Sequence, residues 1–235
     1  MKPAVQRMLD LVYPPRCPFC GQVLGPLTEC PDCAAQLHRL VLRPPHLPET
    51  EFHIDNLGRA AALYRYKGLA RGGVLRFKKG GHPDAARWFG AQMATLFGCD
   101  FAAAYGTMQA ERLPLAPADL IVPAPSSHRR TWQPARLLAI RLSRATGVPW
   151  QDVLKKMPGR EPQEGLNGKD RLRNARGAVG VVRQQPVAGR RILLVDDVIT
   201  TGGTANECAR VLLRGGAQSV DLVCIAASFP GRDDM

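Results

Sequence analysis

The chain has 235 residues, 45% of them hydrophobic and 22% charged, a composition that excludes a disordered protein and allows one main domain with a small additional module. Lys and Arg outnumber Asp and Glu by 32 to 20, and the net charge of +12 predicts polyanionic partners, either nucleic acid or a small phosphorylated ligand. The sequence has no apolar stretch long enough for a membrane span or a signal peptide, so we expect a cytoplasmic protein without membrane insertion.

The first predicted element is a helix over residues 3–13, which Pro14 and Pro15 end. A cysteine-rich segment follows, and residues 41–57 are then rich in Pro, His and acidic side chains without a period, so we expect a linker there. Beyond the linker, short apolar runs alternate with amphipathic segments. The predicted strands cover 58–66, 119–122, 179–182, 191–195 and 219–226, and the predicted helices cover 83–97, 134–146 and 205–214.

This alternation of short strands and helices predicts an α/β fold, because right-handed crossovers place helices on both faces of a mostly parallel sheet. In such sheets the ligand crevice lies at the carboxyl ends of the strands. We divide the chain into an N-terminal helix and cysteine module over 1–40, a linker over 41–57 and an α/β domain over 58–230.

Four of the seven cysteines form two C-x-x-C pairs, Cys17 with Cys20 and Cys30 with Cys33. Each pair places two thiolates at one turn, and two such turns complete a tetrahedral sulfur shell around one Zn²⁺. Four thiolates leave no open position for a substrate, so the predicted zinc is structural. The alternative is a set of reduced cysteines or two local disulfides.

The strongest signal is a Gly/Thr turn after the predicted strand over 191–195, which ends in Asp196 and Asp197. We expect the backbone N–H groups from Thr200 to Thr204 to point at one place, beside the positive end of a helix dipole, as is typical of a phosphate-binding turn.

Two further patterns refine this prediction. Thr204-x-x-Glu207 has the form of a capping box, which would start the following helix at Thr204. The chain has neither the Walker pattern nor G-x-G-x-x-G, so a nucleoside triphosphate or a dinucleotide is disfavoured. We expect a phosphate monoester with a diol, whose hydroxyls donate to Asp196 and Asp197. A solvated strand end or a magnesium site is the alternative for this acidic pair.

Val195 through Thr204 resembles the signature of the type I phosphoribosyltransferases, which is two acidic residues followed by a Thr-Thr-Gly-x-Thr loop. The resemblance implies that Asp196 and Asp197, which are also the candidate catalytic residues, hold the ribose 2- and 3-hydroxyls of phosphoribosyl pyrophosphate. It implies that the 5-phosphate is held by Thr200, Thr201, Gly202, Gly203 and Thr204.

Together with the double C-x-x-C module, the chain resembles the ComF family of competence-associated proteins, in which a zinc ribbon precedes a phosphoribosyltransferase-like domain. Further local agreement lies in Phe77-Lys78-Lys79, in Val122-Pro123-Ala124-Pro125 and between Gln163 and Asn174. The resemblance implies a sheet of the type I phosphoribosyltransferase kind, a small N-terminal zinc ribbon and DNA-uptake proteins as partners.

Basic residues concentrate between Ser126 and Arg176. Four of them are candidates for contact with pyrophosphate or with DNA phosphates: Arg129, Arg130, Arg171 and Arg173. Trp132 and Trp150 lie among these charges, which suits stacking on the bases of single-stranded DNA. The alternative is that both tryptophans are core residues.

These observations favour a ComF-like protein of DNA uptake and natural transformation that binds a phosphoribosyl ligand and single-stranded DNA. The alternative is an active phosphoribosyltransferase of nucleotide metabolism, which displaces pyrophosphate from phosphoribosyl pyrophosphate with Mg²⁺ as cofactor. ComF proteins usually carry Arg-Gly-Phe-Asn-Gln where residues 130–134 of this chain read Arg-Thr-Trp-Gln-Pro. This segment follows the strand whose loop holds pyrophosphate in a transferase, so enzyme activity is left open.

Overall fold

The computed structural model of the chain describes residues 14–25, 27, 29–80, 83–96, 117–126, 132–157, 177–181 and 187–229, with 83 and 84 described by their backbone alone. The helix predicted over 3–13 lies outside these residues. The four candidate phosphate-binding arginines, Arg129, Arg130, Arg171 and Arg173, lie outside them as well.

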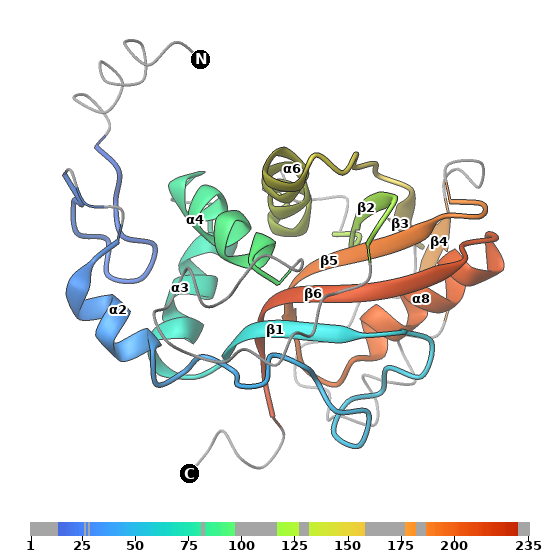
Figure 1. Cartoon of the computed structure of the whole chain (residues 1–235), viewed down its shortest axis with the longest axis horizontal. Helices are drawn as coiled ribbons and strands as arrows, with labels where there is room; N and C mark the ends of the chain where they lie inside the picture. The colour runs from blue at the N-terminus through green and yellow to red at the C-terminus, as the bar shows by residue number, and fades with distance from the viewer. Residues whose placement is uncertain are drawn as a thin grey trace.

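A four-stranded parallel sheet forms the centre of the molecule (Figure 1). Its strands, in their order across the sheet, are β1 (Ala60–Arg65), β6 (Ser219–Ala227), β5 (Arg191–Ile199) and β2 (Leu120–Pro123). The helices are α2 (Pro31–Leu37), α3 (Gly68–Lys78), α4 (Pro83–Ala94), α6 (Pro134–Thr146) and α8 (Gly203–Arg214). A separate antiparallel pair consists of β3 (Leu154–Lys156) and β4 (Val179–Val181). The predicted mostly parallel α/β fold is confirmed.

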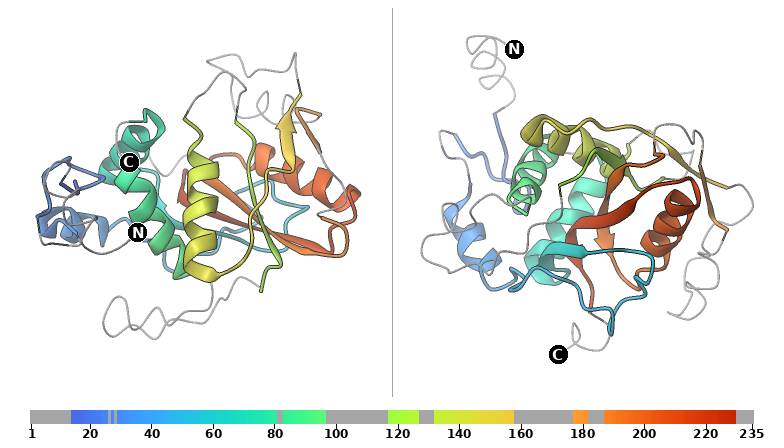
Figure 2. Two further views of the ribbon diagram at one scale, coloured as in Figure 1. Left: turned by 90° about the horizontal axis from the view of Figure 1, so that it is seen from above. Right: turned by 45° about the vertical axis from the view of Figure 1, so that its right-hand side comes forward.

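The strands are buried on both faces, and successive side chains enter two different cores. On β5, Leu193 and Val195 pack with α3, α4 and α6. Ile192 and Leu194 point the other way and pack with α8. Figures 1 and 2 show the resulting layers, with the N-terminal module beside α3 and α4, far from α8.

Helix α6 coincides with the helix predicted over 134–146, because Pro134 stands in its first turn and Gly147 caps its end at a φ of 76°. Helix α3 was not among the elements predicted from periodicity. It contains Gly72 and Gly73, which lower helix propensity, but its apolar side packs against the sheet. None of the helices in the described part of the chain has the length and apolar character that a membrane crossing requires.

The segment over 41–57, which we expected to be an unpacked linker, contributes to the core. It contains five buried apolar side chains: Leu42, Leu47, Phe52, Ile54 and Leu57. Val41 and His46 form isolated antiparallel bridges with Tyr64 and Ala61 of β1. The apolar residues of this segment have no regular spacing, so periodicity does not reveal their burial.

Candidate functional site

The acidic pair Asp196 and Asp197 lies near the carboxyl end of β5, in the centre of the sheet. The backbone N–H of Asp197 donates to the Asp196 carboxylate over 2.8 Å. Because side chains alternate along a strand, Asp197 faces the α3 side of the sheet, and Asp196 faces the α8 side. The two carboxylates therefore lie on opposite faces of the sheet, at the strand end where ligands of parallel sheets bind.

Lys78, the last residue of α3, supplies the counter-charge for this pair. Its ammonium lies 2.9 Å from Oδ1 of Asp197, and the two side chains are 32% and 14% exposed. Burial lowers the pKa of Lys78, but the charge and hydrogen bond of Asp197 outweigh this effect and raise that pKa above its ordinary value. A carboxylate paired with an ammonium does not suit direct coordination of Mg²⁺, because the two cations would repel each other.

The carboxyl group of Asp196 has a pKa well above its ordinary value. Burial, followed by repulsion from the Asp197 charge, raises the pKa of Asp196 to about 7. The positive charges of Lys78 and Lys156 and the N–H of Asp197 act in the opposite direction and are outweighed. A carboxyl group with such a pKa changes its charge near neutral pH, which is a property more frequent in functional sites than elsewhere.

The turn between β5 and α8 has the geometry of an anion cradle. Six consecutive backbone N–H groups, from Thr200 to Ala205, have no acceptor among the residues that the structure describes. They lie at the N-terminus of a twelve-residue helix, where the helix dipole adds positive potential.

The predicted capping box at this helix is wrong. The helix begins at Gly203, and its N-cap is Gly202, which has a φ of 85° and makes no side-chain cap. Glu207 is buried and accepts hydrogen bonds from Arg210, at 2.7 Å, and from the N–H of Gly177, at 2.6 Å. Burial raises the pKa of Glu207, but the Arg210 guanidinium and the Gly177 N–H outweigh burial and lower that pKa overall.

The segment predicted as a linker holds the turn in place. The N–H of His53 donates to the carbonyl of Thr201 over 3.0 Å, and a Cβ on Gly202 would lie 2.6 Å from the His53 carbonyl oxygen. Asn206, in the first turn of α8, accepts hydrogen bonds from the backbone and side-chain N–H groups of Asn56. These contacts were not foreseen, since they join residues that are distant in the sequence.

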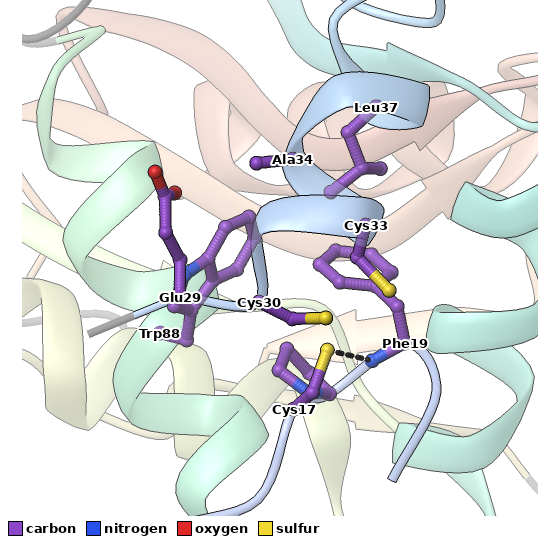
Figure 3. A pocket seen from close by; sticks show the side chains of 9 residues that line it. Cys17, Phe19, Glu29, Cys30, Cys33, Ala34, Leu37 and Trp88 are labelled. Atoms are coloured by element: carbon purple, nitrogen blue, oxygen red, sulfur yellow. Dashed lines mark hydrogen bonds between the residues drawn. The ribbon is translucent and has the colours of Figure 1, made fainter. Parts of the chain in front are cut away.

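The four cysteines of the two C-x-x-C pairs come together in the N-terminal module, and their sulfur atoms all lie within 4.8 Å of one another. Figure 3 shows three of them, those of Cys17, Cys30 and Cys33, around one space beside Phe19 and Trp88. All four thiols are free, so the alternative of two disulfides is not found. Four sulfurs at about 2.3 Å from one Zn²⁺ lie about 3.8 Å apart, and the sulfurs of Cys20 and Cys30 are 3.9 Å apart, so the cluster fits the ion.

Phe19, between the cysteines of the first pair, attaches the N-terminal module to the α/β domain. Its ring makes edge-on contacts with Trp88, Phe89 and Tyr64, with centroids 5.0, 5.6 and 6.5 Å apart. Only 2% of Phe19 is exposed. The module therefore shares a core with α3, α4 and β1.

The two tryptophans of the basic region are half-buried and pack against the core. Nε1 of Trp132 donates to the carbonyl of Phe77 over 2.7 Å, and the Trp132 ring meets Phe77 edge-on. Trp150 lies under the guanidinium of Arg136 at 5.5 Å. These contacts favour the core alternative for Trp132 over the stacking alternative.

Two domain families match the chain. The phosphoribosyl transferase domain matches residues 132–233, and the double zinc ribbon domain matches residues 8–45. The chain thus joins a zinc ribbon module to a domain of the phosphoribosyltransferase fold, as the geometry of the sheet and of the cysteine cluster indicates.

Competence protein F of Haemophilus influenzae is 36% identical over 110 residues, which are 44% of this chain and 48% of that protein. DNA utilization protein YhgH of Escherichia coli is 36% identical over 116 residues, 47% of this chain and 50% of that protein. The chain is a homologue of these two proteins, and its resemblance to the ComF family is confirmed. It spans about half the length of these curated relatives.

Among solved structures, that of the allosteric regulatory enzyme of purine biosynthesis is 25% identical. The match covers 59% of this chain and 25% of that chain, with a TM-score of 0.37.

Proposed function

We propose that the chain binds a phosphoribosyl ligand at the carboxyl end of β5. The observation that carries this proposal is the run of six N–H groups from Thr200 to Ala205, shortly after Asp196 and Asp197, that have no acceptor in the described part of the chain. In this arrangement the N–H groups and the hydroxyls of Thr200, Thr201 and Thr204 accommodate the 5-phosphate. The carboxylates accept hydrogen bonds from the ribose 2- and 3-hydroxyls.

Titration calorimetry with inorganic phosphate, ribose 5-phosphate and phosphoribosyl pyrophosphate tests this proposal. We expect both sugar phosphates to bind more tightly than inorganic phosphate, because only they offer a diol to the acidic pair. The Asp196→Asn variant should weaken ribose 5-phosphate more than inorganic phosphate. Equal affinities of the unmodified protein for all three compounds would contradict the assigned role of the aspartates.

We also propose that Cys17, Cys20, Cys30 and Cys33 bind one structural Zn²⁺. A closed shell of four thiolates leaves no coordination position for a substrate, so the ion contributes to folding. Metal analysis should give close to one zinc per chain. A double Cys17→Ser and Cys20→Ser variant that keeps its full zinc content would contradict the assignment.

The biological role that we propose is the handling of DNA in the cytoplasm during uptake, with single-stranded DNA as a partner. The names of the two relatives refer to competence and to DNA utilization, and the net charge of +12 attracts nucleic acid. Direct DNA binding predicts that the logarithm of affinity falls with the logarithm of salt concentration by about 0.7 for each neutralised phosphate. A double Arg129→Ala and Arg130→Ala variant should flatten that slope by roughly one to two units, and an affinity independent of salt would exclude the role.

The second candidate function is transfer of the ribosyl group, which the match to the phosphoribosyl transferase domain favours. In this reading the chain orients the ribose through its diol and 5-phosphate, and the charges around the site stabilise the departing pyrophosphate. Mg²⁺ would enter with the pyrophosphate rather than on Asp197, whose carboxylate is paired with Lys78. Release of pyrophosphate in the presence of candidate bases tests this function.

A further inference from the structure

Lys78 lies outside the phosphate-binding turn and the cysteine cluster, but it supplies a positive charge beside the acidic pair. Its ammonium is 2.9 Å from Asp197, and about a third of the side chain is exposed, so a ligand at the carboxyl end of β5 can reach it. The exposed Lys79, its neighbour, does not pair with an acid in the described part of the chain.

The backbone beside Lys78 is fixed by its surroundings. Phe77 is fully buried, and its carbonyl accepts the hydrogen bond from Nε1 of Trp132. Gly80 lies against the same indole, since a Cβ placed there would be 3.3 Å from the Trp132 ring. The end of α3 is therefore held next to the start of α6. This fixes the backbone of Lys78, whose ammonium lies beside Asp197.

Lys78 and the phosphate turn approach the acidic pair from opposite faces of the sheet. The turn leads into α8, which covers the face that Asp196 shares with Leu194. Lys78 belongs to α3, on the face that Asp197 shares with Val195. A ribose whose 5-phosphate lies in the turn and whose diol lies on the aspartates would therefore have its C1 side toward Lys78.

We propose that Lys78 is a ligand-binding residue that changes partners: it neutralises Asp197 in the unliganded protein and passes to an anionic group on C1 of the ribose when a ligand binds. The inference rests on the proposed function, because it requires the diol to donate hydrogen bonds to the carboxylate of Asp197. A hydroxyl and the ammonium compete for the same carboxylate oxygens. The displaced cation is partly desolvated, so it is stabilised only by a ligand that carries a second anion.

The experiment compares two ligands that differ only at C1, phosphoribosyl pyrophosphate and ribose 5-phosphate, by titration calorimetry. The Lys78→Met variant should lose about 10- to 100-fold in affinity for phosphoribosyl pyrophosphate, the loss typical of one hydrogen bond to a charged group. Its affinity for ribose 5-phosphate should stay the same or increase, because Asp197 is released from the ion pair. The Lys78→Arg variant should keep the preference for the pyrophosphate ligand.

Lys79→Met is the matched control, since it removes the same charge from the next residue, and it should leave both affinities unchanged. Thermal unfolding shows whether each variant is folded, and Lys78→Gln is measured in parallel in case the methionine destabilises the site. Suppose that the unmodified protein prefers phosphoribosyl pyrophosphate. If Lys78→Met then loses the same affinity for both ligands, or loses none for either, this inference alone is overturned. An unmodified protein that binds neither ligand would overturn the proposed function and this inference with it.

Discussion

A Cβ atom on Gly73 would lie 2.5 Å from Cδ1 of Phe19, closer than real side-chain contacts allow. The absence of a side chain on α3 at this position thus makes room for the ring that lies between the first two cysteines. Gly72 precedes it on the same helix, and a Cβ atom placed there would meet nothing within 4 Å. The two glycines form a natural pair for testing how tightly the N-terminal module is attached.

We expect Gly73→Ala to destabilise the protein by about 1–3 kcal/mol, because the new methyl group overpacks the contact with Phe19. Gly72→Ala should have the opposite effect, stabilising the helix by up to about 1 kcal/mol through its higher helix propensity. Urea unfolding of the two variants measures the difference. Equal effects of the two substitutions would show that Phe19 does not occupy this position in solution.

Removal of zinc should destabilise the α/β domain as well as the N-terminal module. Phe19 lies between two of the ligands and packs against Trp88 and Phe89, so loss of the ion also loosens α4. We expect a chelator to lower the melting temperature of the whole protein in a single transition. If the α/β domain melts at the same temperature with and without chelator, the two units are energetically independent.

Affinity for ribose 5-phosphate should depend on pH through Asp196. The pKa of this group is raised to about 7, and only its ionised form is a pure acceptor for the ribose hydroxyls. Affinity should therefore increase as pH rises through 7. Inorganic phosphate is the control, because it has a similar second ionisation but no diol, and Asp196→Asn should remove the difference between the two ligands.

The same raised pKa has a consequence for stability with a definite sign. The native state holds a proton on Asp196 at pH values where the unfolded chain has lost it, so the free energy of unfolding should fall as pH rises from about 4 to about 7. The Asp196→Asn variant should lack this decrease. Denaturant unfolding of both proteins is measured at each pH across that range. The difference between their free energies of unfolding then gives the contribution of Asp196.

Gly202→Ala should impair the phosphate turn more than a positive φ alone explains. A side chain in the left-handed region costs about 1–2 kcal/mol, and this Cβ would also meet the His53 carbonyl oxygen at 2.6 Å. Gly147→Ala is the control, because Gly147 has a φ of 76° and open space around it. In unfolding experiments, Gly202→Ala should lose more stability than Gly147→Ala. In titrations with inorganic phosphate, only Gly202→Ala should lose binding.

Trp132→Ala should lower the stability of the fold by about 3 kcal/mol, the size expected for loss of a core aromatic ring. The ring packs on Phe77 and its N–H is already bound to a carbonyl. Thermal unfolding and titration with single-stranded DNA are measured on the same variant. An unchanged melting temperature with weakened DNA binding would instead assign Trp132 to a stacking platform.

The local parts of this structure could be predicted from the sequence. Pro134 and Gly147 mark the ends of α6, and the two C-x-x-C turns show which four cysteines meet. The Gly/Thr turn after Asp197 was also predicted, since strand, turn and helix are adjacent in the chain. In each case the residues that determine the feature lie within a short stretch of sequence.

The parts that were missed depend on residues brought together by folding. Phe77-Lys78-Lys79 was noticed in the sequence, but no local pattern shows that Lys78 at the end of α3 pairs with Asp197 of β5. The spacing from Thr204 to Glu207 fits a capping box, yet the Glu207 carboxylate bonds to Arg210 and Gly177 instead. A buried carboxylate prefers a guanidinium to a single amide, and sequence spacing alone does not reveal that competition.

The position of β6 between β1 and β5 affects the order in which the chain can fold. β1 is made early during synthesis, but its partner in the sheet, from Leu222 to Ala227, comes after nearly all of the described chain. β5 has the same partner, so the two halves of the sheet stay apart until β6 is available. Contacts of such long range slow folding and leave strand edges open to aggregation meanwhile. The cysteine module has no such delay, because its four cysteines lie close together in sequence. The Zn²⁺ that we propose can therefore organise this module before the last strand of the sheet is synthesised.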